Sequence, residues 1–388
     1  MSALNLRARQ HLVGRGESAK AAPSTRAAAA LRCSAMATKP VVLHLQSLPL
    51  EPRAAEDLHS KFENLFIWEQ ADPAAFLAEK GASIRGVVTG VRPWVNQELL
   101  DKLPNVEIVS SNTVGLDKVD VSLCKERGVS VTNTPDVLTD CTADTALALL
   151  LACMRQIPAA HQYVCDGRWP KEGDYPVTNK LKPLVLVTAE IMHLCQGLAD
   201  LSSCLYGHSI CAMLAVVSGK RVGVVGLGRI GAAIGKRLEG FGCPISYYSR
   251  SKKPQYPEYN YYNSVVELAR NSDILVVACA LEKATTKIIN REVLDALGPT
   301  GFVVNIARGP VIDEAELVKA LVEKRVAGAG LDVFVNEPEV PKELLNMANV
   351  VVQPHVGSAT YETRNAMANL VVENLVAHFS GKPLLTPV

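Results

Sequence analysis

The sequence predicts an α/β fold with two parallel-sheet lobes and a cleft between them. Short apolar runs alternate with helical patterns from about residue 40 to 135, and the alternation resumes after Ser218. A turn with G-x-G-x-x-G spacing opens the second series, directly after an apolar run. Strands that alternate with helices at this spacing form parallel sheets, and ligands bind outside the carboxyl ends of such strands. We therefore expect two Rossmann-like lobes.

The first series contains four predicted strands and three predicted helices. The strands are Val41–Leu45, Ile84–Val88, Glu107–Ser110 and Val129–Thr132, and the helices are Ala54–Phe62, Gln97–Lys102 and Val119–Arg127. Gly128 ends the third helix, and Asn133-Thr134-Pro135 ends the series, because such residues favour turns over regular structure.

A long apolar helix is predicted next, from Asp140 to Met154. Its length and its near all-round apolarity are typical of a core helix, or of a helix buried between domains or between subunits. Tyr163–Trp169 is predicted as an arm capped by Gly167. We therefore expect a homodimer held through the helix and arm at 140–169.

The second series resumes the alternation. We predict strands at 221–225, 245–248, 274–279, 302–306, 328–333 and 350–352, and helices at 229–240, 264–270, 291–297 and 314–323. One last amphipathic helix, Tyr361–Phe379, is expected to pack back on the first series. The predicted domains are a substrate domain of 39–135 plus 356–388 and a nucleotide domain of 136–355.

Two segments do not fit this plan. Residues 1–38 are rich in Ala, Ser and Arg and poor in acids, as organelle transit peptides are. We favour a start at Met36 and a cytosolic protein, with the plastid stroma as the alternative. Residues 181–217 are apolar but interrupted by Glu190 and Asp200, which makes them a poor membrane span. We interpret them as an atypical insertion, from a splice variant or a translated intron.

The composition excludes several classes of partner. The net charge is only +1 over 388 residues, so neither nucleic acid nor a membrane is expected. The ten cysteines form no C-x-x-C pair and no Cys/His cluster with zinc-finger spacing. We therefore expect no metal site, and free thiols in a reducing compartment.

The glycine-rich turn is predicted to bind a dinucleotide. It reads Gly226-Leu227-Gly228-Arg229-Ile230-Gly231 and joins a strand to a helix, with a second strand after the helix. Gly226 allows the turn, Gly228 lets the backbone approach a pyrophosphate, and Gly231 lets helix and strand pack closely. The helix N-terminus offers free N–H groups and the positive end of its dipole to the phosphates.

The residues after the second strand of this lobe predict NADPH as the cofactor. They read Ser249-Arg250-Ser251-Lys252-Lys253 and are basic and hydroxylated. An NAD-preferring enzyme has Asp or Glu near this place for the ribose hydroxyls. Basic and hydroxylated residues suit the 2′-phosphate of NADPH, so NADH is less favoured.

Three further groups of polar residues follow strands of the same lobe. Arg308 stands in Asn305-Ile306-Ala307-Arg308-Gly309, Asp332 and Glu337 stand in 331–338, and His355 stands in 353–358. A lone Arg is equally well a surface residue, and a lone His is more often structural. Here all three groups fall at the carboxyl ends of strands of one sheet. This convergence predicts a catalytic site, because Arg binds carboxylates and His transfers protons.

Together these motifs resemble the D-isomer-specific 2-hydroxyacid dehydrogenases. The matching motifs are, in order, G-L-G-R-I-G at 226–231, N-I-A-R-G at 305–309, V-F-V-N-E-P at 333–338 and P-H-V-G-S at 354–358. The resemblance covers about Val41 to Val388, apart from 181–217. It is strongest to the plant glyoxylate/hydroxypyruvate and hydroxyphenylpyruvate reductases. Ala280-Leu281-Glu282 departs from the Pro-Leu-Thr that relatives often have beside the cofactor, and we expect only a small effect from it.

The resemblance implies NADPH-dependent reduction of a small 2-oxo acid, such as glyoxylate, hydroxypyruvate or hydroxyphenylpyruvate, to the D-2-hydroxy acid. His355 would donate the proton, with its other ring nitrogen bonded to Glu337, and Arg308 would bind the carboxylate and the keto oxygen. The loop Asn112-Thr113-Val114-Gly115 would add backbone N–H groups for the carboxylate. The cofactor would also be contacted by Ile306, Ala307 and Asp332, the last at its carboxamide.

Two alternatives use the same features. A dinucleotide-sensing protein, as the corepressors of this family are, would bind the cofactor without turnover. An inactive splice isoform would result if 181–217 misplaces the nucleotide lobe. For substrate size, Trp94 is predicted either to line the substrate mouth or simply to pack.

Overall fold

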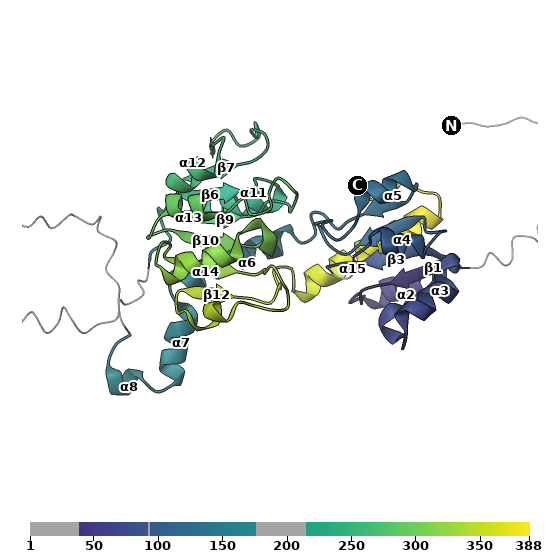
Figure 1. Ribbon diagram of the computed structural model, residues 1–388, viewed down its shortest axis with the longest axis horizontal. Helices are drawn as coiled ribbons and strands as arrows, with labels where there is room; N and C mark the ends of the chain where they lie inside the picture. Colours follow the sequence, from purple (N-terminus) through teal and green to yellow (C-terminus); the bar gives the residue numbers. More distant parts are fainter. Residues whose placement is uncertain (1–38, 92–93, 176–214) are drawn as a thin grey trace, which may run out of the picture. The chain divides into compact units, whose positions relative to one another are not determined.

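The computed structural model describes residues 39–91, 94–175 and 215–388. These residues form two β-sheets in which every strand pair is parallel. Helices cover both faces of each sheet (Figure 1). The predicted α/β class with two Rossmann-like lobes is therefore confirmed.

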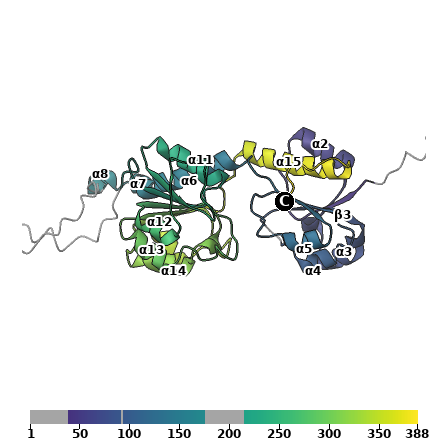
Figure 2. The same cartoon turned by 90° about the horizontal axis from the view of Figure 1, so that it is seen from above.

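The first sheet has five strands in the order β2-β1-β3-β4-β5. Their bounds are β1 Val41–His44, β2 Glu63–Phe66, β3 Ile84–Thr89, β4 Ile108–Ser111 and β5 Ser130–Thr132. One face carries α2 (Pro52–Lys61) and α15 (Tyr361–Phe379), and the other carries α3 (Pro73–Lys80), α4 (Gln97–Asp101) and α5 (Val121–Glu126) (Figure 2). The last helix of the chain thus covers the first sheet, and the Ser110 hydroxyl donates to the Val371 carbonyl at 3.4 Å.

The second sheet has seven strands in the order β12-β11-β10-β9-β6-β7-β8. Their bounds are β6 Val222–Val225, β7 Ile245–Tyr248, β8 Asn260–Tyr261, β9 Ile274–Val277, β10 Phe302–Asn305, β11 Gly328–Leu331 and β12 Val350–Val352. One face carries α6 (Thr139–Met154) and α11 (Arg229–Glu239). The other carries α12 (Val265–Arg270), α13 (Arg291–Leu297) and α14 (Glu314–Val322) (Figure 2).

The strands are apolar runs because both faces of each sheet are covered. All four residues of β6, β9 and β10 are buried, as expected for central parallel strands. Leu149 and Ile234 pack against one face of the second sheet, and Leu268 and Leu294 pack against the other. Each sheet is therefore the middle layer of three.

Some elements differ from the prediction. The edge strands β2 and β8 and the helix α3 were not predicted, and the short turns η1 Ile67–Glu69, η2 Gly81–Ser83, η3 Gly309–Val311 and η4 Lys342–Asn346 are additional. The predicted arm is two short helices, α7 (Ile157–Cys165) and α8 (Trp169–Glu172), because Pro158 and Pro170 each start a new helix at its first turn. Gly167 lies between them with a φ of 62°.

The chain passes between the two sheets twice, and the second connection lies against the N-terminal half of α6. The first enters α6 and the second precedes α15. The Thr145 hydroxyl donates to the Gly357 carbonyl at 3.2 Å, and the Cys141 thiol lies 3.8 Å from the Thr360 hydroxyl. We retain the predicted domain boundaries, 135/136 and 355/356, as a proposal supported by these two connections.

Most of 181–217 and all of 1–38 lie outside the described residues. Of the predicted insertion only Ala215, Val216 and Val217 are described. Ala215 donates its N–H to the Met154 carbonyl at 2.8 Å, so the chain re-enters the structure beside the end of α6.

Candidate active site

A cavity of about 760 Å³ lies at the carboxyl ends of the strands. Residues from both lobes line it, including Val114, Gly115, Gly228, Arg229, Ile230, Ile306, Ala307, Arg308, Asp332, Glu337 and His355. Most of the predicted site residues are therefore brought together. Gly226, Leu227, Gly231 and the segment 249–251 are not in the lining, and Leu227 is instead buried in the apolar core below the turn.

The glycine-rich turn has the geometry that a dinucleotide requires. Gly226 has a φ of 98°, and a Cβ there would lie 2.6 Å from the Cα of Cys279. A Cβ on Gly231 would lie 2.2 Å from the Gly226 carbonyl oxygen, so helix and turn are in close contact. Gly228 faces open space within 4 Å. The turn therefore leaves room for a pyrophosphate at the N-terminus of α11, and the residues present fit the cofactor.

The loop after β7 is held by its own hydrogen bonds. The Ser249 hydroxyl donates to the Ser251 carbonyl at 2.6 Å, and the Tyr261 hydroxyl donates to the Ser249 carbonyl at 3.4 Å. The Arg250 side chain is 82% exposed, and its Nη1 lies 3.2 Å from both carboxylate oxygens of Glu282. The predicted phosphate-binding arginine is therefore already paired with a carboxylate.

His355 and Glu337 form a directly bonded pair. His355 Nδ1 lies 2.8 Å from Glu337 Oε2, and the other carboxylate oxygen accepts the Phe334 N–H at 3.1 Å. Burial alone would raise the pKa of Glu337, but the hydrogen bond from His355 and the nearby positive charges bring it below its ordinary value. The carboxylate is thus ionised and fixed, and it orients the imidazole through Nδ1.

Asp332 supports the backbone that carries His355. Its two carboxylate oxygens accept the N–H groups of Val356 and Gly357, each at 2.8 Å. Burial raises the pKa of Asp332 above its ordinary value, and these two bonds oppose the shift. His355 itself has a φ of 55°, an uncommon conformation for a residue other than Gly, and it follows that the loop is tightly constrained.

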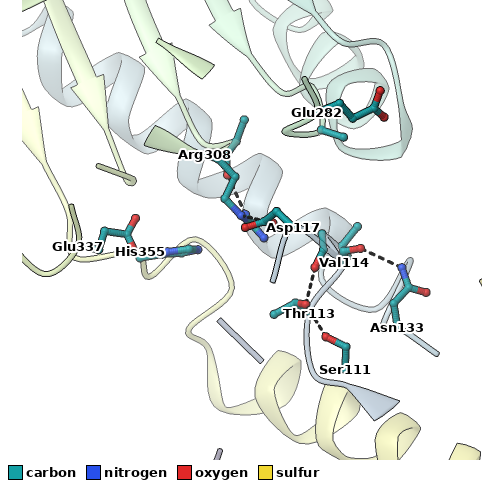
Figure 3. A network of polar contacts seen from close by, with 12 residues as sticks. Ser111, Thr113, Val114, Asp117, Asn133, Glu282, Arg308, Glu337 and His355 are labelled. Atoms are coloured by element: carbon teal, nitrogen blue, oxygen red, sulfur yellow. Dashed lines mark hydrogen bonds and ion pairs between the residues drawn. The ribbon is translucent and has the colours of Figure 1, made fainter. Parts of the chain in front are cut away.

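Arg308 is bonded to the first lobe through Asp117. Its Nε donates to Asp117 Oδ1 at 2.9 Å, and its Nη1 donates to the Ala307 carbonyl at 2.8 Å (Figure 3). Its Nη2 lies against Gly115, where a Cβ would be only 2.6 Å away. The guanidinium therefore lies directly beside the predicted carboxylate-binding loop.

That loop is held by side chains that bind its carbonyl groups. The Asn133 amide donates to the Val114 carbonyl at 2.9 Å, and the Thr113 hydroxyl donates to the Gly115 carbonyl at 2.6 Å (Figure 3). Ser111 Oγ lies 2.8 Å from Thr113 Oγ1. Because its carbonyl groups are occupied in this way, the loop has a fixed orientation against Arg308.

The structure gives partners to two residues whose contacts the sequence did not indicate. Asp117 pairs with Arg308, and Glu282, noted from the sequence only as a departure beside the cofactor, pairs with Arg250. Asp117 was not singled out from the sequence, because nothing in the local pattern indicated a partner almost two hundred residues away. Asn112, in the predicted carboxylate-binding loop, lies in the cavity lining with a side chain that finds no hydrogen-bond partner among the described residues.

Trp94 is not among the residues that line the cavity, whereas Gln46 and Val91 are. Its ring is 57% exposed and packs under the Lys118 ammonium at 4.3 Å from the ring centroid. The structure thus shows Trp94 beside Lys118 and outside the cavity lining. Within the part of the chain that the structure describes, no helix is long and apolar enough to cross a membrane, and no three His, Cys, Asp or Glu residues are grouped as metal ligands.

The comparisons with known proteins agree with this geometry. Residues 184–357 match the family described as D-isomer specific 2-hydroxyacid dehydrogenase, NAD binding domain. The chain is 53% identical to hydroxyphenylpyruvate reductase of Plectranthus scutellarioides and 48% identical to glyoxylate/hydroxypyruvate reductase A of Arabidopsis thaliana. Each match extends over 344 residues, which are 89% of this chain and 98% of the relative.

A solved structure gives the same result for the fold. NADPH-dependent glyoxylate/hydroxypyruvate reductase of Sinorhizobium meliloti, solved with NADP and malonate, is 41% identical with a TM-score of 0.75. The match covers 90% of this chain and 97% of that one. Cavity, motifs, sequence identity and fold agree, and the chain therefore belongs to the D-isomer-specific 2-hydroxyacid dehydrogenase family.

Proposed function

We propose that this protein reduces a small 2-oxo acid to the D-2-hydroxy acid with NADPH. The observation that carries the proposal is the meeting of three groups in one cavity. These are Arg308, the His355–Glu337 pair, and the open glycine-rich turn at the start of α11. A carboxylate-binding cation, a proton donor and a dinucleotide site are the parts that reduction of a 2-oxo acid needs. Glyoxylate, hydroxypyruvate and hydroxyphenylpyruvate are the candidate substrates, as they are in the names of the relatives.

In this mechanism Arg308 and the loop at 112–115 bind and orient the substrate. The donors of Arg308 that face Gly115 would form the bidentate pair with the substrate carboxylate. The N–H groups of Val114 and Gly115 would complete the carboxylate site, since the carbonyls of these residues are already bonded elsewhere. Fixing the carboxylate brings the keto carbon to one position and lowers the entropic part of the barrier.

His355 supplies the proton. Its Nδ1–H donates to Glu337, which leaves Nε2 for the keto oxygen. The ring of His355 points away from Glu337 toward the region that holds Arg308 and Asp117 (Figure 3). As the carbonyl carbon gains a hydride, that is a hydrogen nucleus with two electrons, the Nε2–H bond breaks and the proton passes to the oxygen. Ionised Glu337 stabilises the imidazolium before the transfer.

The second lobe would hold the cofactor, which supplies the hydride when bound. The pyrophosphate would lie against Gly228, Arg229 and Ile230, at the N-terminus of α11. Ile306, Ala307 and Asp332 would contact the nicotinamide end. Ser249, Arg250 and Ser251 would contact the 2′-phosphate, and this loop is why we propose NADPH over NADH.

The test is a substrate panel with both cofactors. Loss of NADPH absorbance would be followed with glyoxylate, hydroxypyruvate and hydroxyphenylpyruvate, and the configuration of the product would be determined. His355→Gln and Arg308→Gln should each reduce kcat/KM by about 10²-fold or more, as loss of a proton donor or a positioning group does. Arg364→Gln would not serve as a control, since Arg364 lies in the cavity lining, whereas Arg291→Gln on α13 is a matched control.

Two outcomes would contradict the proposed reaction, and a third would contradict its stereochemistry. Tight cofactor binding without turnover of any 2-oxo acid would favour a dinucleotide sensor. Failure of this chain together with turnover by a variant that lacks 181–217 would favour an inactive splice isoform. An L-configured product would contradict the proposed stereochemistry while leaving the reaction class intact.

We also propose a homodimer that uses the region 140–169. Ile157, Val164 and Trp169 are apolar and 53%, 53% and 54% exposed, which is unusual for side chains on neighbouring short helices. Sedimentation of the wild type and of a Val164→Glu variant tests this, because a charge in an apolar interface should give a monomer.

For the location we propose the cytosol, to be tested by fusing residues 1–38 and the complete chain to a fluorescent protein.

A further inference from the structure

We propose that Glu282 is a specificity-determining residue that competes with the 2′-phosphate of NADPH for Arg250. The inference rests on the proposed cofactor site and goes beyond it. Arg250 Nη1 lies 3.2 Å from both carboxylate oxygens of Glu282, so the cation intended for the phosphate already has an anionic partner. Glu282 directly follows Cys279, Ala280 and Leu281, which line the cavity.

The sheet order explains why these two residues meet. Strand β6 lies between β9 and β7, and all three strands run parallel. Arg250 follows β7 and Glu282 follows β9, so the pair reaches across the carboxyl end of β6, where the glycine-rich turn begins. A dinucleotide bound at that turn must therefore pass next to the ion pair.

Because the Arg250–Glu282 ion pair is exposed, Glu282 competes with the 2′-phosphate for Arg250 but does not exclude it. The Arg250 and Glu282 side chains are 82% and 43% exposed, and ion pairs in water are weak. A phosphate dianion offers the guanidinium more charge and more acceptor oxygens than a carboxylate does. The 2′-phosphate therefore displaces Glu282, but the carboxylate remains nearby and repels it. The ribose hydroxyl of NADH carries no charge and meets no such repulsion.

The backbone of Glu282 keeps the carboxylate close. Its N–H donates to Thr285 Oγ1 at 2.8 Å, and the Thr286 hydroxyl donates to its carbonyl at 3.0 Å. The carboxylate points away from Arg308 and Asp117 (Figure 3). We therefore expect Glu282 to affect the choice of cofactor and to leave substrate binding unchanged.

Cofactor binding, measured by fluorescence titration with NADPH and NADH, tests this without turnover. Glu282→Gln keeps the size of the side chain and removes its charge. We expect the Kd of NADPH to fall about three- to tenfold, as the loss of one nearby like charge allows, and that of NADH to change by less than about twofold. Glu292→Gln on α13, an exposed glutamate of the same lobe, is the control and should change neither value.

Arg250→Ala separates the failure of this inference from the failure of the cofactor assignment. If Arg250→Ala weakens NADPH but Glu282→Gln has no effect, the competition is refuted while the phosphate site stands. If Arg250→Ala weakens both cofactors equally or neither, the phosphate site itself is wrong. In the double variant the gain from Glu282→Gln should become smaller, since only the repulsion of the phosphate by Glu282 is left to remove, and a gain as large as in the single variant would refute the competition for Arg250.

Discussion

At the scale of single residues, Asp117 has two opposing effects on Arg308. Its carboxylate holds the Arg308 Nε at 2.9 Å and so orients the guanidinium, and both side chains are largely buried, at 10% and 22% exposure. The same carboxylate also shares the positive charge that a substrate carboxylate needs. Positioning and charge competition can be separated by two different substitutions.

We predict that Asp117→Asn lowers the KM of the 2-oxo acid by about two- to fivefold, because the amide oxygen keeps the hydrogen bond while the negative charge is lost. Asp117→Ala should raise KM by about tenfold, since the guanidinium loses its orientation. Steady-state kinetics measures both, and Asp101→Asn, in an exposed ion pair with Arg127, is the control. If both Asp117 variants raise KM equally, the negative charge of Asp117 is itself required for substrate binding.

The Glu337–His355 bond predicts a change in the pH dependence of reduction. Only the protonated imidazole of His355 can donate the proton to the keto oxygen. Ionised Glu337, whose own pKa is lowered, stabilises that protonated form. Glu337→Gln should therefore move the alkaline limb of kcat/KM to lower pH. An unmoved limb with a lower plateau would indicate a purely structural role.

His44 makes the first lobe sensitive to acid. It is 1% exposed, bonds to Asn64 Oδ1 at 2.8 Å, and burial lowers its pKa to about 4. The folded protein therefore keeps His44 neutral while the unfolded chain takes up a proton below about pH 6.5. Above that pH, neutral His44 contributes its full stabilisation to the folded state. As pH falls toward 4, the free energy of unfolding decreases by up to about 3 kcal/mol.

Urea unfolding at pH 7, 5.5 and 4.5 checks this. His44→Gln should be less stable at pH 7 but should lose less of its unfolding free energy between pH 6.5 and 4.5 than the wild type does. The exposed His161→Gln should keep the wild-type slope. If the unfolding free energy of His44→Gln depends on pH as that of the wild type does, His44 is not the group responsible.

At the scale of elements, burial decides which strands the sequence could reveal. The central strands β6, β9 and β10 are covered on both faces, so their apolar runs are unbroken and were predicted. The edge strands β2 and β8 are partly exposed and short, so their residues show neither an apolar run nor strict alternation. The helix α3 did carry a start signal, Asp72 before Pro73, and the Asp72 side chain does cap it.

The same reasoning explains which site residues were found. Arg308, Glu337 and His355 lie in the loops that follow β10, β11 and β12, so the parallel topology brings all three loops to one edge of the sheet. The pairs Arg308–Asp117 and Arg250–Glu282 join residues 191 and 32 positions apart. Such contacts depend on the tertiary arrangement of loops, and a local pattern contains no signal for them.

Gly309 joins two of these loops and carries the prediction at this scale. A Cβ there would lie 2.0 Å from the Phe334 carbonyl carbon, so the Arg308 loop and the Glu337 loop are in direct backbone contact. Gly309→Ala should separate them, lowering kcat/KM by about 10²-fold and stability by about 2 kcal/mol, as overpacking does. Kinetics and thermal unfolding measure both. Gly240→Ala, at the end of α11, should be mild, and a near-normal Gly309→Ala enzyme would contradict the contact.

At the scale of the whole molecule, the end of the chain completes the lobe with which the chain began. Asn374 of α15 is fully buried, and its Oδ1 accepts the N–H groups of Leu385 and Thr386 at 3.0 and 3.2 Å. The Thr386 hydroxyl donates to the Asn133 carbonyl at 2.6 Å, and the Val388 N–H donates to the Val131 carbonyl at 3.0 Å. The C-terminal residues are thereby attached beside β5, at the edge of the first sheet.

Asn374→Leu should release this attachment and destabilise the first lobe alone, by about 2 kcal/mol or more, since several buried backbone groups lose their partner. Hydrogen exchange should become faster in β4 and β5 and stay unchanged in β6 and α11, with NADPH affinity preserved. Glu373→Gln, exposed on the same helix, is the control. Uniformly faster exchange would mean that the two lobes unfold as one cooperative unit.

The two connections between the sheets restrict how the lobes can move relative to each other. With a single connection, one lobe could rotate about it in any direction. The second connection is also attached to α6, through Thr145 with Gly357 and Cys141 with Thr360. Twisting of one lobe against the other is therefore resisted. Each return of the lobes would bring Arg308 back to the same place beside Asp117 and Gly115, so the alignment of the reacting groups is reproduced from one catalytic cycle to the next.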